Sequence, residues 1–140
     1  MLDDKYFETG PPKSTGFEYF NWEWLKKHLQ KFKKINRFDV LSTLSYFTII
    51  TVINEINRYQ PKSKHLYIGG GGANNKLLVQ GILTLTGKTR YLNIGSKISE
   101  KNLESLAFAW LSMMRMESHK ITNTSITGAK KSRLLGTIYR

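Results

Sequence analysis

The residues best suited to chemistry lie in a run of four consecutive glycines at positions 69–72, which Ala73, Asn74 and Asn75 follow. A short apolar run precedes the glycines, and apolar residues at helical spacing come after them. Glycines between a strand and a helix let the backbone approach a ligand closely, and amides at a helix N-terminus attract anionic groups. A nucleotide is the natural candidate. The spacing fits neither a P-loop nor a good GxGxxG fingerprint, so a tight structural turn is an equal alternative on local grounds.

Outside this tract, the residue types that usually perform catalysis or bind metals form no recognisable set. The three histidines are dispersed, no HExxH motif is present, and no Ser–His–Asp triad can be argued from spacing. The chain has no cysteine, which excludes disulfides, a thiolate nucleophile and cysteine-based metal sites. We therefore assign no catalytic and no metal-binding residue.

Charge is the next informative feature, because 22 Lys and Arg against 10 Asp and Glu give a net charge of +12. Such a balance suggests a nucleic-acid or membrane-surface partner. The two basic clusters are Lys26, Lys27, Lys31, Lys33, Lys34 and Arg37, and Lys120, Lys130, Lys131, Arg133 and Arg140. We expect neither cluster to alternate with exposed aromatic rings, and no zinc-finger, KH or RRM signature is present. The first cluster is most simply the wet face of an amphipathic helix, so nucleic-acid binding is the least favoured reading.

The sequence also predicts a cytoplasmic protein without a membrane partner. The longest uncharged apolar stretch, between Asp39 and Glu55, is shorter than the roughly 20 residues that a bilayer span needs. Asp3 and Asp4 stand where a signal peptide would have basic residues.

Apolar periodicity predicts four helices and two strands within one domain. The expected helices cover about residues 22–32, 40–57, 73–85 and 100–114, and the expected strands cover residues 65–68 and 89–94. Asn21, Asp39 and Ser99 are the candidate N-caps, and Gly87 should end the third helix. A strand–helix–strand unit of this length predicts an α/β fold with a small parallel sheet. Two strands are too few for a complete nucleotide-binding sheet, so the chain should be part of something larger.

Four blocks of residues add a more specific signal. The first is Pro11-Pro12-Lys13-Ser14-Thr15-Gly16 with Glu18, Phe20, Asn21, Trp24 and Leu25, and the second is Asp39-Val40 with Thr43, Leu44 and Thr48. The third is Gly70-Gly71-Gly72-Ala73 with Asn75. The fourth is Glu104, the run at residues 106–111, the run at residues 125–129, and Leu135, Gly136, Ile138 and Tyr139. In this order, and over nearly the whole chain, the blocks resemble the C-terminal part of the anhydro-N-acetylmuramic acid kinase family.

The resemblance implies a fold and a reaction. The family has the two-lobed sugar kinase/Hsp70/actin fold, so residues 1–140 are expected to form a partial lobe, a small sheet flanked by about four helices. The family opens the anhydro bridge of 1,6-anhydro-N-acetylmuramic acid with water and phosphorylates the sugar at O6 with ATP, a step of cell-wall recycling.

The resemblance also suggests roles for individual residues. The backbone of Gly70, Gly71, Gly72, Ala73 and Asn75 would lie against the adenosine end of ATP. Glu104 matches a carboxylate that hydrogen-bonds the sugar, although a Glu in the first turn of a helix is also favoured by the helix dipole alone. Lys13, Ser14, Thr15 and Gly16 would shape the cleft wall, and an ordinary Pro-Gly loop is the alternative.

Three positions depart from the family pattern. Phe17 replaces an arginine, Asn74 stands where a histidine is usual, and Asn102 lies near a usual aspartate. More important, the family's N-terminal lobe carries the phosphate-binding loop and the base aspartate, and neither has a counterpart in this chain. ATP and Mg²⁺ would therefore be held only with the help of that missing lobe.

These expectations leave three readings of function. The chain is either a subunit of a split kinase, completed by a separately encoded N-terminal lobe, or a non-catalytic remnant, or less favourably a basic nucleic-acid-binding protein. Because base catalysis alone contributes about 10²- to 10⁴-fold, the chain on its own is expected to be inactive.

Overall fold

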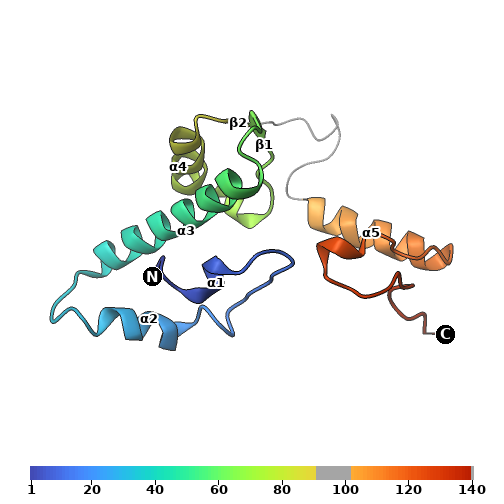
Figure 1. The fold of residues 1–140 in the computed structure, drawn as a ribbon, viewed down its shortest axis with the longest axis horizontal. Coiled ribbons are helices and arrows are strands. Elements are labelled where there is room, and N and C mark those ends of the chain that lie inside the picture. The colour runs from blue at the N-terminus through green and yellow to red at the C-terminus, as the bar shows by residue number, and fades with distance from the viewer. Residues whose placement is uncertain (91–101, 140) are drawn as a thin grey trace.

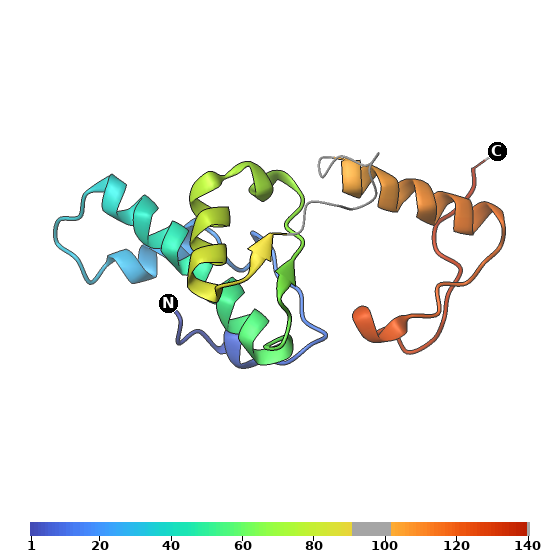
Figure 2. The same ribbon diagram turned by 90° about the horizontal axis from the view of Figure 1, so that it is seen from above.

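The structure is a computed structural model that describes residues 1–90 and 102–139. Its helices are α1 (Lys5–Glu8), α2 (Trp22–Leu29), α3 (Arg37–Tyr59), α4 (Lys76–Thr86) and α5 (Leu103–Met116), with the 3₁₀ turns η1 (Gly71–Asn74) and η3 (Thr124–Ile126). The two strands are β1 (His65–Leu66) and β2 (Thr89–Arg90). In Figure 1 and Figure 2, α3 forms the long axis of the N-terminal part, and α5 with the chain that follows lies to one side of it.

The centre of the fold is a strand–helix–strand unit packed on α3. β1 and β2 pair in parallel, with His65 opposite Thr89 and Leu66 opposite Arg90. α4 connects them and lies against α3. The buried side chains of the described residues come from these two helices, namely Ile49, Ile53, Val79 and Ile82. The predicted α/β class with a small parallel sheet is confirmed.

Capping residues set both ends of helix α4. The Asn75 side chain accepts hydrogen bonds from the amides of Leu77 and Leu78, and Gly87 ends the helix with a φ of +63°. Gly81 faces α3, because a Cβ built on it would lie 2.5 Å from Cδ1 of Ile49. The close approach of the two helices therefore depends on the missing side chain.

An aromatic cluster joins the first 24 residues to α3. The ring centroids of Phe20 and Trp24 are 5.0 Å apart, and those of Phe7 and Phe47 are 5.5 Å apart, both in edge-to-face geometry. Asn21 caps α2 as predicted, with its side chain accepting from the amide of Trp24. The cluster places the loop of residues 9–21 beside the middle of α3.

The structure corrects several predicted boundaries. α3 starts at Arg37, and its N-cap is Asn36 rather than Asp39, because the Asn36 side chain accepts from the amide of Phe38. Residues 71–74 form the 3₁₀ turn η1, so α4 begins at Lys76 instead of residue 73. β1 covers only residues 65–66 of the predicted 65–68, and the described part of the second predicted strand is Thr89–Arg90. The predicted strand residues 91–94 and the predicted cap Ser99 lie outside the described residues.

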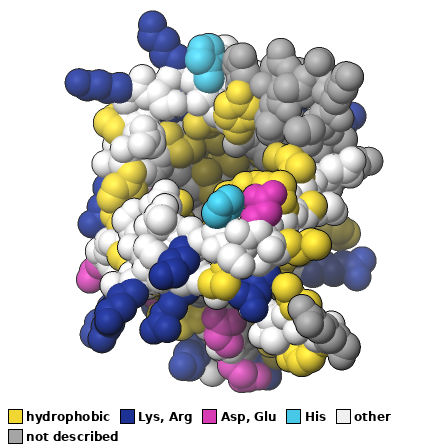
Figure 3. All heavy atoms as spheres, turned by 90° about the vertical axis from the view of Figure 1, so that its right-hand side faces the viewer, with side chains coloured by type: hydrophobic (Ala, Val, Ile, Leu, Met, Phe, Trp, Pro, Cys, Tyr) yellow, Lys and Arg dark blue, Asp and Glu magenta, His cyan; other side chains and the backbone are white. Residues whose placement is uncertain are grey.

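Large hydrophobic side chains remain exposed over much of the described surface. Phe17 is 86% exposed and Phe108 is 64% exposed. The face in Figure 3 carries a hollow lined by hydrophobic side chains. Exposed apolar surface on this scale marks sites of contact with other molecules or segments. Within residues 1–90 and 102–139, no helix has both the length and the hydropathy needed to cross a bilayer.

Candidate functional site

The glycine tract follows β1 and forms an open turn. Gly70 has a φ of +77°, a conformation that side chains other than glycine rarely adopt. The amide of Ala73 donates to the carbonyl of Gly70, and the amide of Asn75 donates to that of Gly72. A Cβ built on Gly70, Gly71 or Gly72 would meet nothing within 4 Å. The tract therefore presents bare backbone to open space instead of packing into the core.

The tract lies next to the first turn of α5, which carries Glu104. A Cβ built on Gly69 would lie 2.7 Å from Cδ1 of Leu103, so the Leu103 side chain reaches the backbone at Gly69. Glu104 follows Leu103 and is exposed. The structure thus brings the predicted nucleotide loop and the predicted sugar carboxylate onto adjoining elements, although the sequence separates them by more than 30 residues.

The Lys13 side chain is largely shielded from solvent. Its ammonium lies 2.9 Å from Oε1 of Glu55 in α3, 3.5 Å from the carbonyl oxygen of Tyr6 and 4.9 Å from the centre of the Tyr6 ring. The Lys13 side chain is only 12% exposed. Periodicity gave no hint of Glu55 as its partner, because the two residues are 42 positions apart. The structure places Lys13 as a link between its loop and two helices.

The rest of the Lys13 loop (residues 9–16) borders a groove beside α3. Ser14 and Thr15 are exposed, whereas Gly16 is half-buried with its carbonyl accepting from the amides of Tyr19 and Phe20. The groove has a volume of about 530 Å³. Its lining combines aromatic rings with polar groups, among them Tyr6, Phe20, Phe47, Thr15, Thr48 and Glu55. Such a mixed lining is typical of sites for small polar ligands.

The Lys13 loop also touches the C-terminal segment. A Cβ built on Gly128, which has a φ of +69°, would lie 2.8 Å from Cγ of Pro12. The segment that carries Gly128 folds back on itself, since Ile121 and Arg133 form an antiparallel bridge. The predicted site residues therefore fall into two groups. One joins the glycine tract to α5, and the other joins the Lys13 loop to α3 and Gly128.

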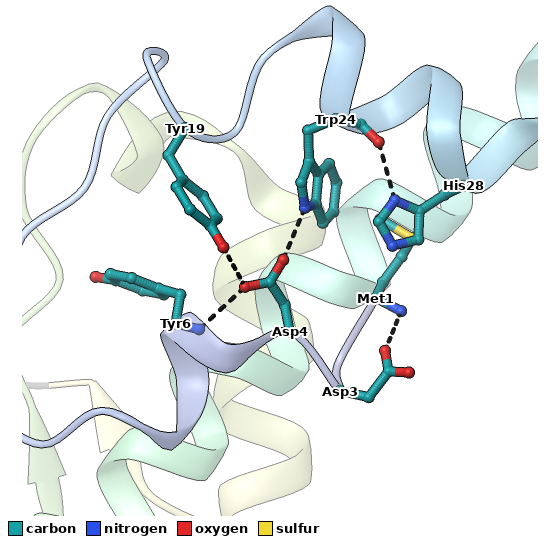
Figure 4. Close-up of polar contacts among 7 residues, drawn as sticks. All are labelled: Met1, Asp3, Asp4, Tyr6, Tyr19, Trp24 and His28. Carbon is teal, nitrogen blue, oxygen red and sulfur yellow. Dashed lines mark hydrogen bonds and ion pairs between the residues drawn. The ribbon is translucent and has the colours of Figure 1, made fainter.

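A polar node around Asp4, shown in Figure 4, was not predicted. Its carboxylate accepts from Nε1 of Trp24 at 2.9 Å, from the Tyr19 hydroxyl at 2.7 Å and from the amide of Tyr6 at 3.0 Å. The hydrogen bond from Trp24, followed by that from the Tyr6 amide, lowers the pKa of Asp4, and Asp4 in turn raises the pKa of Tyr19. An Asp just before a helix is an N-cap signal, and it could have revealed α1.

The described part of the chain contains no cluster of metal-ligating side chains. Residues 1–90 and 102–139 contain no group of three or more His, Cys, Asp or Glu side chains able to hold a metal ion. Within those ranges, the glycine tract offers exposed backbone, and no cluster of carboxylates could hold a divalent cation.

The fold and site together define a small α/β unit in which a glycine turn after a strand opens beside a second helix. A comparison with known families makes the assignment specific. The family model for anhydro-N-acetylmuramic acid kinase matches residues 1–140. The chain belongs to this family.

Named relatives agree with the family assignment. The chain is 41% identical over 142 residues to the anhydro-N-acetylmuramic acid kinase of Coxiella burnetii (strain Dugway 5J108-111), covering 99% of this chain and 37% of that protein. It is 36% identical over 140 residues to the kinases of Pseudomonas syringae pv. syringae (strain B728a) and Sulfurovum sp. (strain NBC37-1), covering 99% of this chain and 38% of each. The chain therefore spans less than two fifths of the length of these relatives.

Proposed function

We propose that residues 1–140 form the C-terminal lobe of an anhydro-N-acetylmuramic acid kinase with the actin-like sugar kinase fold, and that the lobe acts as one wall of the catalytic cleft. The observation that carries this proposal is the match of the whole chain to only 37–38% of each relative. A complete enzyme would open the anhydro bridge of the sugar and transfer the γ-phosphoryl group of ATP to it.

Each group of site residues has a part in the proposal. The open backbone of Gly70, Gly71 and Gly72, with Ala73 and Asn75, would contact the adenosine end of ATP. Glu104, on the adjoining turn of α5, would accept hydrogen bonds from the sugar. Lys13, Ser14, Thr15 and Gly16 would form the wall of the cleft beside the groove along α3. The exposure of the glycines and of Glu104 supports this assignment.

The other lobe would supply the remaining chemistry. Phosphoryl transfer needs groups that neutralise the phosphates, a bound Mg²⁺ and a base that orients the attacking water. We assign none of these to the described residues, so the partner lobe would contribute the phosphate loop, the base and the metal site. Exposed hydrophobic side chains such as Phe17 and Phe108 provide surface on which such a lobe could pack.

Co-expression tests the proposal. The 140-residue chain is produced with the part of the Coxiella burnetii relative that it does not span, and ADP release is measured with ATP and 1,6-anhydro-N-acetylmuramic acid. We expect a stable complex with turnover, and no turnover above a no-enzyme blank from either part alone. A folded chain that neither associates nor restores turnover would indicate the non-catalytic remnant instead. Turnover by the chain alone would contradict the division of roles.

A further inference from the structure

The turn between α2 and α3 combines positive charge with exposed apolar side chains. Residues 24–38 contain six Lys or Arg residues and no Asp or Glu. All six basic side chains are exposed. The neighbouring hydrophobic side chains are also exposed, at 60% for Trp22, 58% for Phe32, 41% for Ile35, 60% for Phe38 and 59% for Leu41. The sequence-based expectation that this basic cluster does not alternate with exposed aromatic rings is therefore wrong.

The apolar side chains of this turn do not pack tightly against one another. A pocket of about 270 Å³ opens beneath the turn. Its apolar lining includes Leu25, Leu29, Phe32, Ile35, Val40 and Leu44. Two of the exposed rings make cation–π contacts. Nζ of Lys26 lies 5.7 Å from the centre of the Trp22 ring, and Cζ of Arg37 lies 5.0 Å from the centre of the Phe38 ring. Charge and apolar surface are thus interleaved instead of lying on opposite faces.

This surface is remote from the candidate site. Glu55, the partner of Lys13, lies near the other end of α3. Glu55 follows Arg37 by 18 positions in the helix, which is about 27 Å at the helical rise of about 1.5 Å per residue. Figure 1 and Figure 2 both show the turn at the end of the molecule that lies away from α5. A partner at the turn would leave the glycine tract and Glu104 uncovered.

In contrast to the sequence-based expectation of no membrane partner, we propose that the turn between α2 and α3 docks on an anionic phospholipid surface, with its lysines at the headgroups and the Phe32 and Ile35 side chains inserted below them. Clustered Lys and Arg are attracted to anionic lipid, and aromatic and aliphatic side chains enter the interface. Single-stranded nucleic acid offers the same negative charge and can stack on rings, but it gives aliphatic side chains such as Ile35 and Leu41 no apolar medium in which to be buried. The mixture of side chains therefore favours lipid.

Vesicle binding by the 140-residue chain tests this inference without any kinase activity. Sedimentation with phosphatidylcholine vesicles containing phosphatidylglycerol should retain the chain, and pure phosphatidylcholine vesicles should not. Each basic residue at a membrane surface changes the affinity by about fivefold. The variant K31Q/K33Q/K34Q should therefore bind roughly 100-fold more weakly. The matched variant K120Q/K130Q/K131Q removes the same charge from exposed positions elsewhere and should bind like the original chain.

A second measurement tests insertion. Because the chain has no cysteine, Lys34→Cys carries a single environment-sensitive fluorophore, and Lys130→Cys provides the control. Anionic vesicles should shift the emission of the label at position 34 to shorter wavelength and leave the label at position 130 unchanged. Phe32→Ser with Ile35→Ser should abolish the shift at position 34. Circular dichroism confirms that each variant is folded.

Three results would overturn the inference. These are equal loss of vesicle binding in the two triple variants, an unshifted label at position 34, and tighter binding to a single-stranded RNA than to anionic vesicles at the same salt concentration. The last result would identify the turn as a nucleic-acid surface. None of these outcomes bears on whether the completed kinase is active, so the inference and the proposed function fail independently.

Discussion

The ammonium of Lys13 lies 2.9 Å from the carboxylate of Glu55, and this pair joins the loop of residues 9–16 to α3. Both side chains are mostly removed from solvent, at 12% and 32% exposure. Removal of one partner from such a pair leaves the other charge without compensation. The pair therefore fixes the conformation of a loop that would otherwise be connected to the fold mainly by aromatic packing.

We predict that Glu55→Gln lowers the free energy of unfolding by about 1–3 kcal/mol, because Lys13 keeps its burial and loses its countercharge. Urea denaturation of the chain measures this change. The matched control is Glu23→Gln, which breaks an ion pair with Lys26 whose partners are 71% and 48% exposed. That variant should change stability by about 0.5 kcal/mol or less. Equal effects of the two variants would contradict the role assigned to Glu55.

The Asp4 node predicts a pH dependence of stability. The pKa of Asp4 is lowered in the folded chain, so its stabilising contribution is present above the carboxyl pKa of the unfolded chain, at about 4, and is lost as the pH falls through the folded value. Asp4→Asn should lower the free energy of unfolding by about 1–2 kcal/mol at pH 7, because a charged acceptor of three hydrogen bonds becomes neutral.

Urea denaturation from pH 7 down to pH 2 checks this prediction. The stability difference between the original chain and Asp4→Asn should shrink below a pH of about 4. Glu8→Gln, at an exposed position of the same helix α1, serves as the control for a lost carboxylate. A difference that stays constant down to pH 2 would show that Asp4 acts through shape and not through charge.

Much of the central fold could be predicted from the sequence, because it depends on local signals. The helical spacing of apolar residues located α2, α3, α4 and α5, and Asn21 and Gly87 marked a beginning and an end correctly. The predicted N-cap of α3 was wrong because Asn36 and Asp39 are both good capping residues. Only the hydrogen bond from the amide of Phe38 to the Asn36 side chain distinguishes them. The predicted start of α4 was misplaced because four residues are too few to distinguish the 3.0-residue period of a 3₁₀ turn from the 3.6-residue period of an α-helix.

The site was less accessible to sequence reasoning because its contacts are long-range. The glycine tract was found from residue type, and its position after β1 and its open backbone agree with that prediction. Its approach to Leu103 and the pairing of Lys13 with Glu55 connect distant parts of the chain, and no local pattern encodes them. The roles of the site residues in binding stay predictions.

The packing of α4 on α3 gives a further prediction. In an isolated helix, Gly81→Ala would stabilise by about 1 kcal/mol through helix propensity. Here the new methyl group would lie 2.5 Å from Cδ1 of Ile49, which is 5% exposed, so we expect a net loss of about 1–3 kcal/mol. Ile49→Val removes that carbon at a cost of about 0.5–1.5 kcal/mol. Thermal unfolding should show that Gly81→Ala lowers the free energy of unfolding much less in the Ile49→Val background than in the original chain. Additive effects would contradict the proposed contact.

The last prediction concerns the nucleotide role of the glycine tract. Position 72 has open space around it, so Gly72→Val should leave the folding stability of the chain almost unchanged. In the completed kinase, however, its side chain would keep the adenosine end of ATP from approaching the backbone. We expect the KM for ATP to rise roughly tenfold or more, equivalent to about 1.4 kcal/mol of binding, with kcat largely retained. The matched control is Gln80→Val at an exposed position of α4, which should leave the KM unchanged. A stable Gly72→Val enzyme with an unaltered KM would exclude the tract from the nucleotide site and support its reading as a structural turn.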